Sequence, residues 1–247
     1  MIINLSFFLW QTLGVYQVGR YSPYPHFAKY VNVKTQNQVW IRRCAQRGLL
    51  ESGLADVVSI QNLVYAGETL FTPSYRGRGF VMMRHPVKRA VDLFYYRQHA
   101  TWERTYDAEL AVMSLEDYVA SDKVVENLEV RMLNNLKDFS VEVTEAHVAV
   151  AKEILRRKFV VGIFEWFDVS MVRIEKYFGW WEQHKVMSNL TVNNCHYRII
   201  EHGDHIGNFP KVPDKENIYS ILMTRNWADV ELYHYSKTLF AEQAKLL

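Results

Sequence analysis

Residues 80–96 read Phe80-Val-Met-Met-Arg84-His-Pro86-Val-Lys88-Arg89-Ala-Val-Asp92-Leu-Phe-Tyr-Tyr96, and they predict one strand followed directly by one helix. The four apolar residues at 80–83 are typical of a short buried strand. We expect the helix to begin at Pro86, because the first helical position makes no use of a backbone N–H. The junction would place the guanidinium of Arg84 at the carboxyl end of the strand, beside the partial positive charge of a helix N-terminus.

Such a junction would hold an anion, for example a terminal phosphate, between a fixed positive charge and free backbone N–H groups. The same order of residues also suits an ordinary strand–helix junction whose basic side chains lie in solvent. The pattern alone leaves both interpretations open.

Composition limits the class of protein. The chain has 247 residues, 49% hydrophobic and 14% aromatic, so it can bury one sizeable core. A net charge of +2 gives no indication of a nucleic-acid-binding surface. The two cysteines, Cys44 and Cys195, are too few for a disulfide framework or a cysteine-rich zinc site. The histidines between residues 184 and 205 match no ligand spacing, so we predict no metal site.

Strand-like and helix-like segments alternate, which is typical of an α/β domain with a mainly parallel central sheet flanked by helices. We assign residues 30–247 to one such domain and leave residues 1–29 unassigned. Strands are expected at residues 30–33, 54–60, 80–83 and 159–164. Helices are expected at residues 39–48, 65–70, from 86, at 124–136, 144–157, 168–178 and from 226.

Four segments, in a fixed order, resemble the carbohydrate sulfotransferases, nearest to the branch that includes the heparan sulfate and galactose sulfotransferases. Arg84-His-Pro86 with Arg89 is similar to the family's segment for the 3′-phosphate of the nucleotide. Asn127-Leu-Glu-Val-Arg131 is similar to its Asn-x-x-x-Arg helix. The other two segments are residues 151–165 and 226–243, and the whole resemblance spans about residues 60–243.

The resemblance implies a P-loop-like α/β fold and the transfer of a sulfuryl group from 3′-phosphoadenosine-5′-phosphosulfate to a carbohydrate hydroxyl. It implies that Arg84 binds the 3′-phosphate through its guanidinium, a strong charge-assisted contact, and that Arg131 assists from the next helix. A solvated or ion-paired helix arginine is an equally good interpretation of Arg131. The resemblance also implies a sugar or glycan acceptor and a place in the Golgi lumen or membrane.

Asp92 departs from the family. The family usually has a serine at this position, eight residues after the arginine, where its hydroxyl donates a second hydrogen bond to the phosphate. An ionised aspartate has no donor and would repel a phosphate in contact by about 1–4 kcal/mol. Either the nucleotide binds more weakly here, or Asp92 points away and pairs with a lysine such as Lys88 one turn earlier.

A second departure concerns the loop for the 5′-phosphosulfate, which in the family carries a lysine, small residues and a serine or threonine. No such loop occurs in residues 1–60, and the nearest candidate, residues 33–39, has no glycine to let the backbone approach a phosphate. We expect the loop upstream of Met1. Residues 2–18 carry no charge and are a weak candidate for a membrane anchor or a buried segment.

The catalytic base is not identified. Asp56, Glu68 and His26 are the candidates in the region where a base is expected, and none has a distinguishing pattern. The sequence therefore favours a sulfotransferase. A catalytically inactive sulfotransferase-like binding protein is the alternative, and a P-loop kinase relative is a more distant one.

Overall fold

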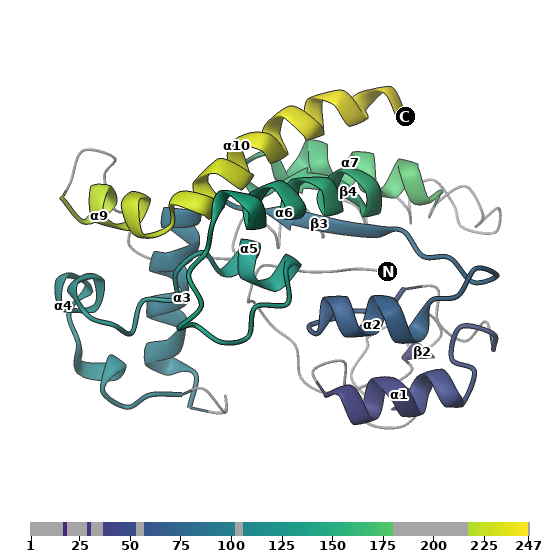
Figure 1. Cartoon of the computed structure of the whole chain (residues 1–247), viewed down its shortest axis with the longest axis horizontal. Coiled ribbons are helices and arrows are strands. Elements are labelled where there is room, and N and C mark those ends of the chain that lie inside the picture. Colours follow the sequence, from purple (N-terminus) through teal and green to yellow (C-terminus); the bar gives the residue numbers. More distant parts are fainter. Residues whose placement is uncertain are drawn as a thin grey trace.

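Two parallel strands form the centre of the structure. The computed structural model describes residues 37–52, 57–101, 106–179 and 217–246, together with the backbone of residues 17–18 and 29–30. Strand β3 (Gly79–Met83) pairs with β4 (Phe159–Ile163) in register, from Gly79 opposite Phe159 to Met83 opposite Ile163. Helices surround this pair, so the α/β class expected from the sequence is confirmed for the described residues (Figure 1).

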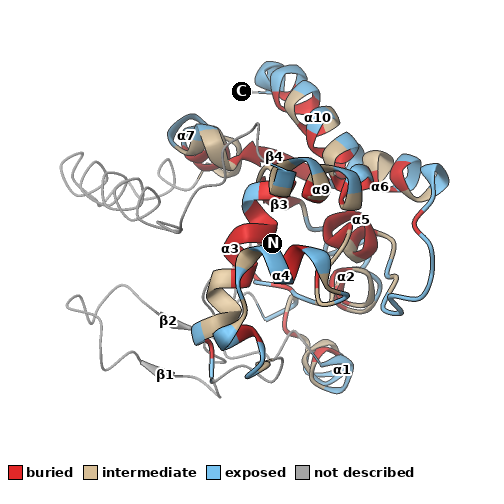
Figure 2. Ribbon diagram, turned by 90° about the vertical axis from the view of Figure 1, so that its left-hand side faces the viewer, coloured by how far each residue is buried: buried red, intermediate tan, exposed pale blue. Residues whose placement is uncertain are grey.

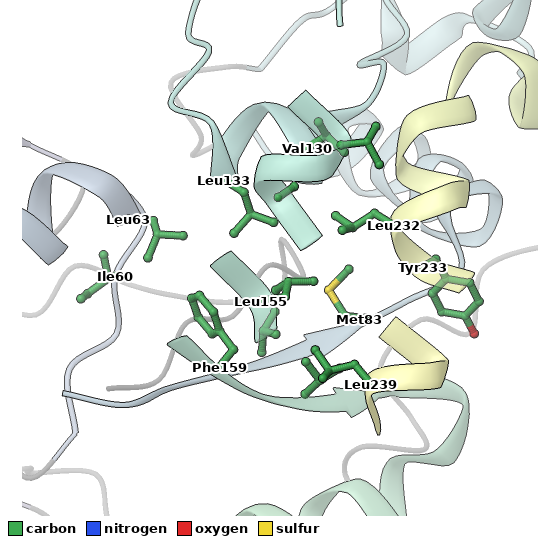
Figure 3. Packing of buried hydrophobic residues seen from close by; sticks show 14 of the residues in the cluster. Ile60, Leu63, Met83, Val130, Leu133, Leu155, Phe159, Leu232, Tyr233 and Leu239 are labelled. Carbon is green, nitrogen blue, oxygen red and sulfur yellow. The ribbon is translucent and has the colours of Figure 1, made fainter. Parts of the chain in front are cut away.

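Both faces of the strand pair are covered, because successive side chains point to opposite faces. Val81 and Met83 join the main core, with α5 (Leu128–Leu133), α6 (Glu145–Lys158) and α10 (Trp227–Glu242). Figure 3 shows side chains from the strands and from these helices meeting there. Phe80 and Met82 join a second cluster with α7 (Phe167–Phe178). This two-sided burial explains why the strands read as unbroken apolar runs.

The remaining elements extend this core. Helix α3 (Pro86–His99) follows β3, with proline at its first turn as expected. Figure 2 shows buried residues gathered on α3 and α5, whereas α1 (Gln38–Gln46) buries only Ile41. The other elements are β1 (Gln17–Val18), which pairs antiparallel with β2 (Lys29–Tyr30), α2 (Leu63–Leu70), η1 (Leu110–Val112), α4 (Leu115–Ala120), η2 (Phe164–Trp166), α9 (Asn217–Arg225) and η3 (Gln243–Leu246).

Several predicted boundaries were wrong for local reasons. The described part of 54–60 has one isolated bridge, at Ser59, in place of a strand. Helix α5 is shorter than the predicted 124–136, because Asn127 (φ 50°) and Asn135 (φ 57°) adopt left-handed backbone conformations that a helix cannot contain. Helix α7 begins at Phe167, one residue before the predicted start at 168, and its N-cap is Trp166. Helix α9 was not predicted.

The N-termini of α5 and α10 cap each other. The carboxylate of Asp229, on α10, accepts hydrogen bonds from the backbone N–H groups of Val130 (2.9 Å) and Glu129 (3.1 Å) in the first turn of α5. In return, the side-chain oxygen of Asn127, the N-cap of α5, accepts from the N–H groups of Ala228 (3.0 Å) and Asp229 (3.3 Å). Each side chain satisfies donors that a helix end leaves unpaired, so the two helix ends are fixed to each other.

Arg89 attaches α3 to this double cap. Its Nη2 donates to the carboxylate of Asp229 at 2.8 Å, and both side chains are almost fully buried. The side-chain oxygen of Asn226 accepts from the N–H of Asn127 at 3.1 Å and lies 3.4 Å from the same Nη2. The helix that begins next to Arg84 is therefore attached to α10 through a buried ion pair.

We expect Asp229→Ala to destabilise the fold by about 3–5 kcal/mol, because it leaves Arg89 buried without its charged partner and also removes both acceptors at α5. The matched control is Glu231→Ala on the same helix, which breaks a partly exposed ion pair with Lys152 and should cost about 1 kcal/mol or less. Urea unfolding followed by circular dichroism measures both. Equal losses for the two variants would contradict the role assigned to Asp229.

Candidate functional site

The candidate site lies at the carboxyl ends of β3 and β4. Because the two strands are parallel and in register, Arg84 after β3 and Phe164 after β4 emerge at the same edge. Helix α3 begins two residues beyond Arg84, and the side chain of its N-cap residue, His85, makes no capping hydrogen bond. In open α/β sheets this edge is where ligands usually bind.

Arg84 and Asp92 form an ion pair at this edge. One terminal nitrogen of the Arg84 guanidinium contacts the carboxylate of Asp92, and the two side chains are 11% and 7% exposed. The flat face of the guanidinium lies 4.5 Å from the ring centre of Phe164. Its Nε has no hydrogen-bond partner within the described part of the chain. Asp92 thus pairs with the predicted phosphate ligand itself, and not with a lysine.

Burial raises the pKa of Asp92 to about 6, because an enclosed carboxylate loses hydration. The positive charge of Arg84 opposes this shift and is the largest opposing effect. The negative charge of Glu165 raises the pKa further, and Lys88 lowers it slightly. The result is a carboxyl group that changes charge close to neutral pH beside Arg84, the predicted phosphate ligand.

Glu165 organises the other side of the edge. Its carboxylate accepts hydrogen bonds from the hydroxyl of Tyr233 (2.8 Å) and the backbone N–H of His85 (3.2 Å), and it lies 3.7 Å from Nζ of Lys88. The imidazole of His85 lies between two rings, stacked on Tyr219 (5.8 Å between centroids) and edge-on to Tyr233 (5.3 Å). Residues of α3, η2, α9 and α10 therefore converge on the strand ends.

The pKa of Tyr233 is raised, first by burial and then by the charge of Glu165, so its hydroxyl stays protonated and donates to that carboxylate. Figure 3 shows the ring of Tyr233 beside the core with its hydroxyl pointing out of the core. The ring packs and the hydroxyl binds Glu165, which fixes the orientation of that carboxylate at the site.

A buried group of charges lies behind the site. Nε of Arg89 is 3.6 Å from the Glu129 carboxyl group, while its Nη2 binds Asp229. Burial raises the pKa of Glu129 from its ordinary 4.5 to about 8, and Arg89 only partly opposes this. Burial also raises the pKa of Asp229, against the effects of Arg89 and two backbone donors. With one cation for two carboxyl groups, Glu129 is the one that holds a proton at neutral pH.

The guanidinium of Arg131 binds backbone carbonyl groups of residues 126–141. It donates to the backbone carbonyl oxygens of Val141 (2.8 Å), Glu126 (3.2 Å), Asp138 (3.2 Å) and Phe139 (3.5 Å). These bonds hold the segment after α5 against the helix. The structure brings Arg84 and Asp92 together at the end of β3, whereas it uses the guanidinium of Arg131 to organise residues 126–141.

Other predicted candidates are only partly represented. Glu68 is exposed on α2, whereas His26, Asp56, residues 33–36 and the histidines at 184–205 lie outside the described residues. Among the residues that the structure describes, no group of three or more His, Cys, Asp or Glu side chains could hold a metal ion. In the same part of the chain, no helix has both the length and the apolar character needed to cross a membrane.

Sequence reasoning gave no role to Glu165, Tyr233 or Tyr219. The first two lie within segments of the resemblance, but the hydrogen bond between them joins residues 68 positions apart. One signal was available for Glu165: it follows the second apolar strand much as Arg84 follows the first, and parallel strands end at one edge. Tyr219 lies on a helix that the sequence analysis did not predict.

Comparison with family models, with curated proteins and with solved structures found no match for this chain.

We predict that Glu129→Gln will become increasingly stable relative to the wild type as the pH rises from 5.5 to 8. The raised pKa means that the folded protein keeps a proton which the unfolded chain has released, so rising pH favours unfolding until it passes the folded pKa. The wild type should therefore lose up to about 1 kcal/mol per pH unit relative to the variant, levelling off above pH 8. Urea unfolding at several pH values measures this, and parallel curves would contradict it.

Proposed function

We propose that the protein is a sulfotransferase that moves a sulfuryl group from 3′-phosphoadenosine-5′-phosphosulfate to a carbohydrate hydroxyl, with Arg84 binding the 3′-phosphate of the nucleotide. One observation carries the proposal: strand β3 delivers Arg84 to the carboxyl edge of a parallel strand pair, directly before the N-terminus of helix α3. That arrangement supports anion binding, because the guanidinium charge and the first-turn N–H groups of α3 act at one place.

The surroundings of Arg84 support a held phosphate more than a solvated arginine. The side chain is largely enclosed and rests on Phe164, so its guanidinium is already oriented. Lys88, in the first turn of α3, is 53% exposed and adds a second positive charge near the N-terminus of this helix. Orienting a guanidinium before the ligand arrives lowers the entropy that binding must overcome.

The proposal extends to the P-loop-like fold, to a sugar or glycan acceptor and to the Golgi, all of which follow from the resemblance. In the reaction, the acceptor oxygen bonds to sulfur, the bond from sulfur to the 5′-phosphate oxygen breaks, and the hydroxyl proton passes to a base. The residues in the described ranges support the nucleotide end of this arrangement and assign no base.

A catalytically inactive sulfotransferase-like binding protein is the second candidate, and one observation favours it. The ion pair with Asp92 already neutralises Arg84, so a phosphate must compete with a carboxylate for the same guanidinium. Such competition weakens binding without preventing it. Transfer of labelled sulfate to glycans tests the candidates: detectable transfer supports the enzyme and excludes an inactive binding protein, whereas binding alone is compatible with either.

We expect 3′-phosphoadenosine-5′-phosphate to raise the melting temperature of the wild type and Arg84→Ala to abolish that shift, because the substitution removes the phosphate's charged ligand. Arg156→Ala, at an exposed arginine on α6, is the matched control and should keep the shift. Differential scanning fluorimetry measures all three.

Arg84→Ala leaves Asp92 without its partner and could weaken the fold by itself. Two further variants avoid this problem, because neither buries an unpaired carboxylate: the single variant Asp92→Asn and the double variant Arg84→Gln/Asp92→Asn. The nucleotide should stabilise the single variant and not the double variant. An equal shift in both would remove Arg84 from the site and overturn the proposed function.

A further inference from the structure

We infer that Asp92 couples anion binding at Arg84 to the uptake of one proton: the neutral carboxyl group donates a hydrogen bond to the phosphate, in the place where the related enzymes have a serine hydroxyl. This inference rests on the proposed function, because it concerns the ligand of the same site. It makes Asp92 a ligand-contacting residue that sets the affinity of the site according to pH.

Geometry is the first support. Asp92 lies on α3, eight residues after Arg84, and its carboxylate touches the guanidinium that the phosphate would bind. With a side chain that is 7% exposed, it is enclosed with Arg84 and is not at liberty to turn into bulk solvent. A phosphate on Arg84 therefore meets the Asp92 carboxyl group, and only the protonated form of that group can donate a hydrogen bond to it.

Charge balance is the second support. The groups that act on Asp92 are Arg84 from the end of β3, Lys88 from α3 itself and Glu165 from η2. The two cations are thus already matched by two carboxylates before any ligand arrives. Adding a phosphate to an ionised Asp92 and Glu165 leaves excess negative charge in an enclosed place, and a proton on Asp92 relieves it.

Glu165 is held by other partners, because its carboxylate accepts hydrogen bonds from the Tyr233 hydroxyl and the His85 backbone N–H. The pKa of Asp92, raised to about 6, means that roughly a tenth of molecules hold its proton at pH 7. Protonation on binding therefore needs only a moderate shift of an existing equilibrium.

The experiment measures the dissociation constant of 3′-phosphoadenosine-5′-phosphate by isothermal titration calorimetry from pH 6 to pH 8. It compares the wild type with Asp92→Asn, whose amide is a permanent neutral donor, and with Asp92→Ser, the residue that the family has. The phosphates of the ligand and Glu129 also titrate, but they are common to all three proteins. The ratio of the dissociation constants of wild type and variant therefore isolates Asp92.

We expect both variants to bind more tightly than the wild type at pH 8, with a ratio that falls about tenfold for each pH unit toward pH 6. Titrations in two buffers of different ionisation enthalpy should show that the wild type takes up close to one proton more than Asp92→Asn. Asp168→Asn, the same substitution at an exposed aspartate on α7, is the control and should follow the wild type.

Two results would overturn the inference, and they are distinguishable. If the variants bind and the ratio stays constant with pH, Asp92 does not take up the proton, while the phosphate site and the proposed function stand. If wild type, Asp92→Asn and Asp92→Ser all fail to bind at every pH while circular dichroism shows them folded, the phosphate site is absent and the proposed function fails with it.

Discussion

One buried carboxylate, that of Asp229, determines how the helices of this protein meet. It belongs to α10, accepts from two N–H groups of α5 and binds Arg89 of α3. An ionised carboxylate away from water is stable only when its charge and its hydrogen bonds are satisfied, and here α3 and α5 together satisfy them. Because each of these partners has little freedom to move, the three helix positions are mutually determined. The apolar core around the strands supplies the cohesion, while this polar centre selects one arrangement of it.

The same constraint places the candidate site. Tyr233 lies four residues after Asp229, one turn along α10, so the helix that binds Arg89 also carries the hydroxyl that fixes Glu165. Arg89 and Asp92 lie within one turn of each other on α3, and the first faces the scaffold while the second faces Arg84. Movement of α3 would therefore alter the Arg84–Asp92 pair and the double cap together.

The sequence predicted the parts of this structure that depend on local rules. Apolar runs predicted β3 and β4, Pro86 predicted the start of α3, and the helix predicted to end at residue 178 is α7, which Gly179 follows in the left-handed conformation at φ 61°. Helix boundaries that depend on residues distant in the sequence were not predicted. Asn127 is held by the side chain of Asn226 and the backbone N–H of Ala228, about a hundred positions away, so no local pattern indicated that α5 would start after it.

The candidate site divides in the same way. The order of strand, Arg84 and helix depends on neighbouring residues, so it could be predicted from the sequence. The aspartate at position 92, where the resemblance leads one to expect a serine, could also be recognised there. Asp92 contacts Arg84 because of the way in which α3 is rotated about its axis against β3. The ion pair between Arg89 and Asp229 determines that rotation. Likewise, Arg131 could be recognised as a helix arginine, but three of the four carbonyl groups that it binds become its neighbours only after the chain turns at Asn135.

The scaffold and the site share one electrostatic arrangement, and they differ in the pH at which it changes. In each, an enclosed arginine lies beside a carboxyl group whose pKa is raised by burial: Arg89 lies beside Glu129, and Arg84 lies beside Asp92. Loss of hydration favours the neutral form of a carboxyl group, more strongly where burial is complete. Accordingly, the pKa of Glu129 rises to about 8 and that of Asp92 only to about 6. Around pH 7, Glu129 is mostly protonated and Asp92 is mostly ionised. The charge of Asp92 can therefore change without disturbing the polar centre that holds the helices together.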